Sequence, residues 1–308
     1  MDILITGCAG FIGSHLLEKL KTEGHSVVGI DNYFHSCRNK EWRKEHKIEK
    51  VDIRDNIDEY VRDCDIVFHC AAIIHVDYSI KYPRETIDIN VNGTLNVLEA
   101  VNKYKKEMVF ASSSEVYGSS QSNRMDESHP LDCQSPYAAS KVAGDRLCKA
   151  FYDTYGTKVA ILRNFNTFGP YQADDSYGGV IAIFTRRALL GEDLPIFGSG
   201  TQERDYMWID DAIRGYELCV EKKLWGETIN IGSGKTISIN DLAELIIKIT
   251  GSKSKIVHIA PRPGEVIRLC ADTSKAEKLG FKSKTNFTDN LIEYVQFYKG
   301  TFLQAVRK

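Results

Sequence analysis

The sequence has little of what would mark a secreted, membrane-spanning or nucleic-acid-binding protein. Its 8 cysteines include no Cys-x-x-Cys pair and no regular framework, so we expect no disulfide-rich secreted domain, and a reducing cytoplasm fits better. No apolar run is long enough to cross a bilayer. Because the first predicted strand starts at residue 2, we expect no signal peptide. The net charge of −2 favours neither nucleic acid nor an anionic membrane as a partner.

The remaining composition is that of an ordinary globular chain. Hydrophobic residues make up 43% and charged residues 27%, and no repeat or low-complexity segment interrupts the 308 residues. That length suits a larger domain with a smaller partner, or one large α/β unit.

A glycine-rich turn near the start is the most informative stretch. An apolar strand at residues 3–5 precedes it, and a segment with helical periodicity follows at 15–20. Glycines in such a turn let the backbone approach a pyrophosphate and let the helix pack close to the strand, while the amides at the helix start hold the phosphates. We therefore predict a dinucleotide site whose turn is formed by Gly7, Gly10, Phe11, Ile12 and Gly13.

Acidic residues follow the next two predicted strands. The strand at 26–30 ends in Asp31, followed by Asn32, and an acid there would take the ribose hydroxyls and repel the extra phosphate of NADP. The sequence therefore favours NAD. A third short strand ends near Asp52 and Ile53, which could hold the adenine by a hydrogen bond and an apolar contact, or could be only a strand end with an exposed acid.

The first half of the chain alternates strands and helices. Further strands are predicted at 66–69, 108–111 and 159–162, and helices at 84–104 and 136–155, whereas residues 32–47 are expected to be a polar loop. This alternation predicts a doubly wound parallel sheet, the Rossmann arrangement.

Two features beside the fourth strand have more than one interpretation. Ala71 and Ala72 follow this strand and would let a cofactor lie close, and Asn90 could reach the site or tie down a neighbouring loop. We expect no metal site, because His69 and His75 have no carboxylate or cysteine set at ligand spacing and are better explained as structural histidines.

The alternation of predicted strands and helices becomes less regular after about residue 169. Helices are predicted at 178–190, 210–221, 240–250 and 286–298, with short strands near 228–231 and 256–259. We predict a cofactor domain over 1–169 and a smaller α/β lid over 170–308, with segments that can cross back to the first domain.

Tyr137 and Lys141 are candidates for proton transfer. They are four residues apart and share one face of the predicted helix. A phenol has a reference pKa of about 10, and a nearby ammonium, together with the charge of NAD⁺, would lower it. Tyr137 could then take a proton from a sugar hydroxyl while the hydride leaves the same carbon. The Tyr-x-x-x-Lys spacing alone is a common coincidence, but its place after a dinucleotide half-domain and a serine-rich strand end favours catalysis.

With these motifs the chain resembles the extended short-chain dehydrogenases/reductases, in particular the NAD-dependent nucleotide-sugar epimerase/dehydratase family. The resemblance covers nearly the whole length and rests on the Gly-x-x-Gly-x-x-Gly turn, Asp31, Ala71, Ala72, Asn90, Ser112–Glu115, Tyr137, Lys141, the stretches 163–170 and 204–205, and Pro263-Gly264-Glu265 leading to Arg268. It implies oxidation of a nucleotide-activated sugar at C4, transformation of the ketone and, usually, return of the hydride.

The resemblance also implies roles for single residues. Ser113 would bind the reacting C4 hydroxyl, Tyr137 would act as base, and Lys141 would activate it and bind the nicotinamide ribose. Ser114, Asn166, Arg204 and Arg268 would approach the sugar diphosphate or nucleotide, although each arginine could equally form a surface ion pair. The expected partners are a nucleotide-diphosphate sugar and a second copy of the chain in a homodimer.

Glu115 bears most directly on the reaction. A carboxylate at this position resembles the 4,6-dehydratases and the UDP-glucuronate decarboxylases, whereas simple 4-epimerases usually carry a small or apolar residue. Next to a C4 ketone it could remove the C5 proton while the C6 oxygen departs. Many dTDP-glucose dehydratases have an aspartate immediately before this glutamate, but here Ser114 stands there, as in GDP-mannose dehydratases, which leaves the leaving-group acid unidentified. Glu115 could also serve only to hold a loop.

A nucleotide-sugar 4,6-dehydratase is therefore the first interpretation. The alternatives are a 4-epimerase like UDP-glucose 4-epimerase, a decarboxylase, a C4 dehydrogenase that releases NADH, and an NAD-binding regulatory protein. The last is disfavoured because a sensor has no need of Ser113, Tyr137 and Lys141 together.

Overall fold

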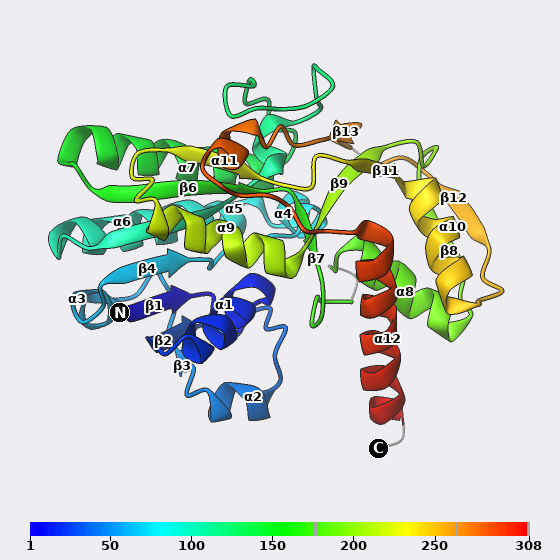
Figure 1. Cartoon of the computed structure of the whole chain (residues 1–308), viewed down its shortest axis with the longest axis horizontal. Coiled ribbons are helices and arrows are strands. Elements are labelled where there is room, and N and C mark those ends of the chain that lie inside the picture. The colour runs from blue at the N-terminus through cyan, green and yellow to red at the C-terminus, as the bar shows by residue number, and fades with distance from the viewer. Residues whose placement is uncertain (175–177, 263, 307–308) are drawn as a thin grey trace.

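The main sheet organises the first half of the molecule (Figure 1). The computed structural model describes residues 1–174, 178–262 and 264–306. Within these residues, seven parallel strands lie in the order β10-β6-β5-β4-β1-β2-β3. They are β1 (Asp2–Thr6), β2 (Ser26–Asp31), β3 (Glu49–Lys50), β4 (Ile66–His69), β5 (Glu107–Ser113), β6 (Lys158–Asn164) and β10 (Thr228–Ile231). The predicted doubly wound parallel sheet is confirmed.

Helices cover both faces of this sheet, and the strands are apolar on both sides for that reason. In β1, Ile3 and Ile5 belong to the core that contains α1 (Phe11–Thr22) and α9 (Ile209–Glu221), whereas Leu4 belongs to the opposite core. That second core contains α3 (Asp58–Arg62), α6 (Gly93–Lys103) and α7 (Pro136–Tyr155). Alternate residues of one strand thus stabilise two separate cores.

Two predicted elements are corrected by the structure. The segment 32–47 contains a short helix, α2 (Lys40–Glu45), because the Asn39 side chain caps it by accepting a hydrogen bond of 2.8 Å from the Trp42 amide. The helix predicted over 84–104 is interrupted: α5 (Pro83–Ile87) leads into a π-helical turn, η1 (Asp88–Asn92), and only then into α6. A further helix, α4 (Val76–Lys81), precedes them.

After β6, most strands form two smaller sheets, and one strand, β10, belongs to the main sheet. Strands β11 (Thr236–Ser238), β9 (Glu203–Trp208) and β13 (Arg268–Leu269) form one sheet, joined by β7 (Asn166–Phe168) on β9, and β8 (Leu194–Phe197) pairs with β12 (Ile256–Ile259). Helices α8 (Val180–Leu190), α10 (Ile239–Thr250) and α12 (Phe287–Val306) lie beside them, whereas α11 (Ser274–Lys278) lies near β10 (Figure 1). The strand predicted near 228–231 pairs with β6, so it completes the main sheet and does not belong to the small sheets.

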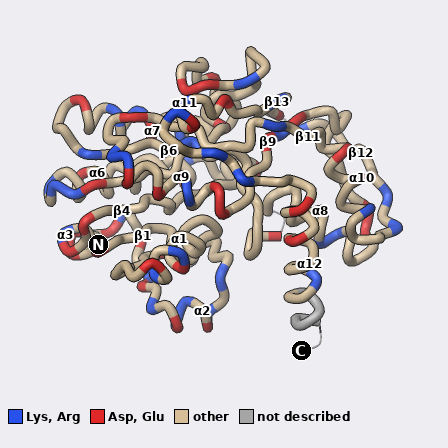
Figure 2. The backbone as a smooth tube through the Cα atoms, in the orientation of Figure 1, with Lys and Arg blue, Asp and Glu red and all other residues tan. Residues whose placement is uncertain are grey.

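Charged residues of both signs are interspersed along the chain (Figure 2). In the part of the chain that the structure describes, none of the helices combines the length and the apolar character needed to cross a bilayer.

Candidate cofactor and active site

The glycine turn between β1 and α1 has a shape that only glycine allows. Gly7 has a φ of 68°, and a Cβ there would lie 2.6 Å from the backbone of Ala71 at the end of β4. A Cβ at Gly13 would lie 2.3 Å from the carbonyl oxygen of Gly7. The Gly10 amide closes the turn with a hydrogen bond of 3.1 Å to the same oxygen. The turn therefore packs closely against the sheet and the first turn of α1. A turn without side chains lets a pyrophosphate approach the backbone amides.

Asp31 ends β2 beside this turn. Its carboxylate accepts hydrogen bonds from the amides of Ala9 (3.0 Å) and Tyr33 (2.6 Å). Burial raises the pKa of Asp31, and the two amides oppose that effect. Since a carboxylate has about four acceptor positions, roughly two remain for the hydroxyls of a ribose. The turn and Asp31 together fit NAD.

Asn90 lies on η1 and is buried. Its side chain accepts a hydrogen bond from the Ile73 amide (2.7 Å) and donates to the Ile73 carbonyl and the Ser140 hydroxyl (both 2.8 Å). Of the two interpretations, holding the neighbouring loop is thus the one with contacts in the structure. The expected contact with the cofactor stays a prediction, as it does for Ala71 and Ala72.

His69 is a structural histidine. Its ring nitrogens lie 2.7 Å from the Thr6 hydroxyl and 3.0 Å from the Thr94 hydroxyl, so it links β1, β4 and α6. Burial, together with the charge of Lys141, lowers its pKa to about 3. A neutral ring bound at both nitrogens has no free atom for a metal.

The start of α7 positions Tyr137. The Ser135 hydroxyl caps the helix by accepting a hydrogen bond from the Ala138 amide (3.1 Å), and Pro136 occupies the first helical position. The Ser79 hydroxyl, on α4, accepts a hydrogen bond of 3.0 Å from the Tyr137 amide. The Ser140 hydroxyl donates to the Tyr137 carbonyl at 2.7 Å, which connects Asn90 to this helix.

Burial has the largest effect on the pKa of Tyr137. Burial raises the pKa of Tyr137 to about 12, opposed by its hydrogen bond with Ser113 and reinforced by the charge of Glu115. The Lys141 ammonium group is also buried; it donates a hydrogen bond of 2.9 Å to the Ala111 carbonyl, and burial lowers its pKa to about 8. Burial thus disfavours the charged form of both side chains, and the lowering of the Tyr137 pKa by Lys141 together with the charge of NAD⁺ stays a prediction.

Glu115 lies on a 3₁₀ turn, η2 (Ser114–Tyr117), directly after β5. The Ser113 hydroxyl caps this turn by accepting a hydrogen bond of 3.2 Å from the Glu115 amide. Burial raises the pKa of Glu115; Arg204 and Arg262 act against this effect and Glu265 adds to it. Groups from the small sheets and from the loop before β13 therefore act electrostatically on this carboxylate.

The predicted substrate-binding arginines both form ion pairs. Arg204 contacts Glu265 at 2.7 Å with side chains only 12% and 21% exposed, whereas Arg268 contacts Glu203 at 2.6 Å with side chains 39% and 34% exposed. Arg204 thus lies in the enclosed part of the site, and Arg268 lies nearer the surface. Asn166 donates a hydrogen bond of 3.4 Å to the carbonyl of Asp205. Pro263, part of the motif before Arg268, lies outside the described residues.

Several contributors had no signal in the sequence. Ser79 and Ser140 touch Tyr137 through its backbone, and serines on helices carry no recognisable pattern. Arg262 lies one residue before the motif that includes Glu265, so the motif could have drawn attention to it.

The fold and the glycine turn define a dinucleotide-binding α/β protein. Comparisons with known proteins show its family. Residues 3–232 match the model of the NAD dependent epimerase/dehydratase family. The chain is 40% identical to a UDP-N-acetyl-alpha-D-glucosaminuronate decarboxylase of Bacillus cytotoxicus over 83% of this chain and 82% of that protein. Its structure is similar to the UDP-glucose 4-epimerase of Thermotoga maritima solved with UDP-glucose (TM-score 0.91, 32% identity, 98% and 100% covered). It is similar also to a dTDP-glucose 4,6-dehydratase of Streptomyces venezuelae solved with NAD and TYD (0.90, 32%, 97% and 97%).

The chain belongs to the NAD-dependent epimerase/dehydratase family. It is an enzyme of the extended short-chain dehydrogenase/reductase type, and its cofactor is NAD.

Proposed function

We propose that this enzyme is a nucleotide-sugar 4,6-dehydratase. The observation that carries the proposal is the carboxyl group of Glu115, which follows Ser113 at the end of β5 and has a pKa raised by burial. Its charge in turn raises the pKa of Tyr137, so Glu115 acts electrostatically on the proposed base. Simple epimerisation needs no second acid of this kind.

Each group would have one task in the reaction. Bound NAD supplies the acceptor for the hydrogen removed from C4. Tyr137 takes the proton of the C4 hydroxyl, which Ser113 holds by a hydrogen bond, and the C4 ketone then acidifies the C5 proton. Glu115 removes that proton, the C5–C6 double bond forms, and the C6 oxygen leaves as water. Return of the hydride to C6 and transfer of the proton held by Tyr137 to C5 then give a 4-keto-6-deoxy sugar, with the net loss of one water. Ser114 supplies no carboxyl group, so Glu115 delivers the proton it has taken to the departing oxygen, a task that its raised pKa supports.

The test is a panel of UDP-, GDP-, dTDP- and CDP-hexoses incubated with the enzyme and analysed by mass spectrometry. We expect loss of one water from one of them. In Glu115→Gln, water loss should fall by roughly a hundred- to ten-thousandfold, the usual contribution of a general acid–base group, while NADH absorbance reveals continuing C4 oxidation. Glu59→Gln, at an exposed position on α3, is the matched control. Full dehydration by Glu115→Gln would refute the role of Glu115.

Two other reactions have specific support. Ser114 in place of a leaving-group acid, and the similarity to the Thermotoga maritima enzyme, favour 4-epimerisation, which would leave the mass unchanged and alter the stereochemistry. The Bacillus cytotoxicus relative favours decarboxylation, which would appear as loss of carbon dioxide from a nucleotide-linked uronic acid. Release of NADH with a stable ketone would indicate a C4 dehydrogenase, and NAD binding with no change in any sugar would indicate a regulatory protein.

We also infer a cytoplasmic homodimer whose substrate lies under a lid formed by the small sheets of β7, β9, β11 and β13 and of β8 and β12. The absence of a disulfide framework in the sequence supports the first part, and light scattering of the purified protein tests the second.

A further inference from the structure

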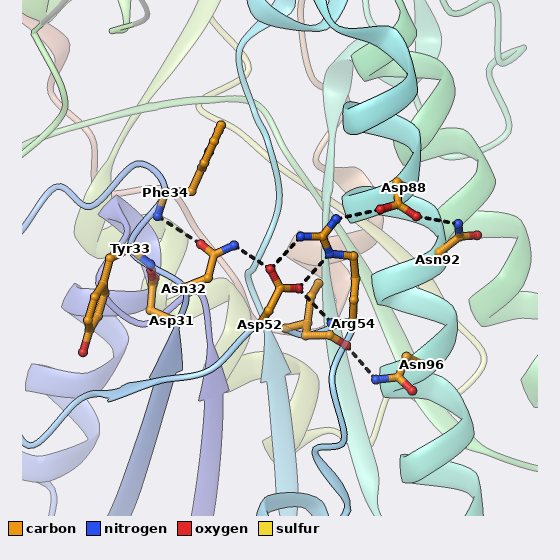
Figure 3. A network of polar contacts seen from close by, with 10 residues as sticks. Asp31, Asn32, Tyr33, Phe34, Asp52, Arg54, Asp88, Asn92 and Asn96 are labelled. Carbon is orange, nitrogen blue, oxygen red and sulfur yellow. Dashed lines mark hydrogen bonds and ion pairs between the residues drawn. The ribbon is translucent and has the colours of Figure 1, made fainter.

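The loop between β2 and α2 is anchored at both ends. At its start, the Asn32 side chain donates a hydrogen bond of 2.9 Å to the Asp52 carboxylate (Figure 3). At its end, the amides of Cys37 and Arg38 donate to the Ala9 carbonyl at 2.9 and 3.3 Å. Because Ala9 belongs to the glycine turn, the position of Arg38 depends directly on that of the turn.

The Arg38 side chain is buried, with an exposure of 3%. Its Nε donates to Oγ of Ser14 at 3.0 Å, and its Nη2 donates to Oε2 of Glu18 at 2.9 Å. Both partners lie on α1, the helix that begins at the glycine turn. Trp42 donates to Oε1 of the same glutamate at 2.8 Å, and its ring centre lies 5.0 Å from Cζ of Arg38. These contacts fix the guanidinium group to the cofactor side of the molecule and compensate for the burial of its charge.

The same guanidinium group contacts the second half of the chain. Its Cζ lies 3.5 Å from the ring centre of Tyr171, a separation at which the positive charge is attracted to the ring face. Tyr171 lies just after β7 and has a φ of 64°, a left-handed conformation that is unfavourable for a residue with a side chain. Phe297 on α12 packs against the same ring, with the two centres 4.9 Å apart. A strained backbone persists only where neighbouring contacts hold it, and Arg38 supplies such a contact.

We propose that Arg38 is a positioning residue that couples the cofactor turn to the segment after β7. A pyrophosphate bound by the amides of the turn fixes Ala9 and the start of α1, and these in turn fix the guanidinium group that holds Tyr171. Bound NAD therefore places the chain that leads away from Asn166 before the nucleotide sugar binds. The inference rests on the proposed position of the substrate under the small sheets, and it does not depend on which reaction follows at C5 and C6.

The test follows backbone hydrogen exchange of the full chain by mass spectrometry, with NAD absent and with NAD at saturation. Peptides that cover the glycine turn report that NAD is bound, and peptides that cover residues 167–174 report on the segment. In the wild type we expect NAD to slow exchange in both regions. For residues 167–174 the slowing should be roughly three- to tenfold, the size expected when one cation–π contact becomes fully formed. No sugar is present, so a failure of the proposed dehydration would leave this result unchanged.

Two substitutions remove the contact from its two sides. Arg38→Ala and Tyr171→Leu should keep the effect of NAD on the glycine turn but abolish its effect on residues 167–174. Tyr171→Phe preserves an aromatic face for the guanidinium group and should retain both effects. Because Tyr171 is 42% exposed, Tyr171→Leu should fold even where Arg38→Ala does not.

The matched control is Arg43→Ala. Arg43 is also stacked on a tyrosine, with its Cζ 4.2 Å from the ring centre of Tyr33 in the same loop, and its loss should leave the exchange pattern of the wild type. A purely structural contact predicts that Arg38→Ala and Tyr171→Leu accelerate exchange of residues 167–174 by the same factor with and without NAD, and that result would overturn the proposal. The absence of any effect of NAD on this segment in the wild type would overturn it as well, and so would loss of the effect in Arg43→Ala.

Discussion

Replacing Lys141 by methionine should stabilise the NAD-free protein while abolishing turnover. The lysine is buried at an exposure of 4%, and its ammonium group lies 5.1 Å from the centre of the Phe110 ring. Among the described residues, this group donates one hydrogen bond, of 2.9 Å, to the Ala111 carbonyl. Burying a charge with so few partners opposes folding, and a side chain of similar length without the charge removes that opposition.

The pKa of Lys141 gives the magnitude. Burial lowers it from the ordinary value of 10.5 to about 8, and one pKa step corresponds to about 1.4 kcal/mol. At about pH 7, where the amine is charged in both states, the buried charge therefore destabilises the folded protein by roughly 3 kcal/mol. Loss of the hydrogen bond to Ala111 offsets about 1 kcal/mol of the gain. We expect Lys141→Met to raise the free energy of unfolding by about 2 kcal/mol.

The dependence on pH has a definite sign. As the pH rises from about 8 towards 10.5, the folded protein releases the proton of Lys141 before the unfolded chain does. The unfolded state then binds more protons, so this group's contribution to stability rises with pH. Buried tyrosines and cysteines with raised pKa values act in the opposite direction in both proteins, so the difference between wild type and variant isolates Lys141. That difference should fall as the pH rises, pass through zero, and leave the variant less stable by about 1 kcal/mol, the value of the lost hydrogen bond, by about pH 10.5.

Urea unfolding of the NAD-free proteins, followed by circular dichroism at several pH values, measures this difference. The control is Lys149→Met on the same helix, because Lys149 is exposed and pairs with Asp153 at the surface. It should show no such pH-dependent gain. A Lys141→Met variant less stable than wild type at neutral pH, or a difference independent of pH, would refute the reasoning.

Two further predictions concern the core and the cofactor turn. Arg163→Met leaves Asp145 without its ion-pair partner at 2.8 Å, in a place where both side chains are at most 5% exposed, and should lower the free energy of unfolding by roughly 3–5 kcal/mol in guanidinium titrations. Lys158→Met, which breaks an exposed pair, should change it by less than about 1 kcal/mol; similar values for the two variants would contradict the argument. Gly13→Ala puts a methyl group 2.3 Å from a carbonyl oxygen of the turn and should weaken NAD binding at least about tenfold by calorimetry. Gly300→Ala should leave the affinity unchanged, because a methyl group there meets no described atom within 4 Å. Retained affinity in Gly13→Ala would count against the role of the glycine turn.

Much of the fold could be predicted because its signals are local. The apolar runs of β1, β4, β5 and β6 and the periodicity of α7 are read from neighbouring residues, and each stands within a few residues of its predicted position. The interruption of the helix at Asp88–Asn92 left no such trace, since a π-helical turn depends on what packs against it. The return of β10 to the main sheet is decided by pairing with β6, about 65 residues earlier in the chain, which no local pattern encodes.

The sequence alone determined the glycine turn with Asp31, the main alternation of strands and helices in the first half, and the placement of Tyr137 and Lys141 on one helix. Steric limits and helical spacing, which act over short stretches of chain, are the reason. Only the tertiary structure decided how the side chains behave. Burial raises the pKa of Tyr137, and the Asn90 side chain binds the backbone of Ile73. The Asp52 carboxylate accepts a hydrogen bond from Arg54. Desolvation and hydrogen-bond saturation depend on residues brought together from distant parts of the chain, so they appear only once the chain has folded.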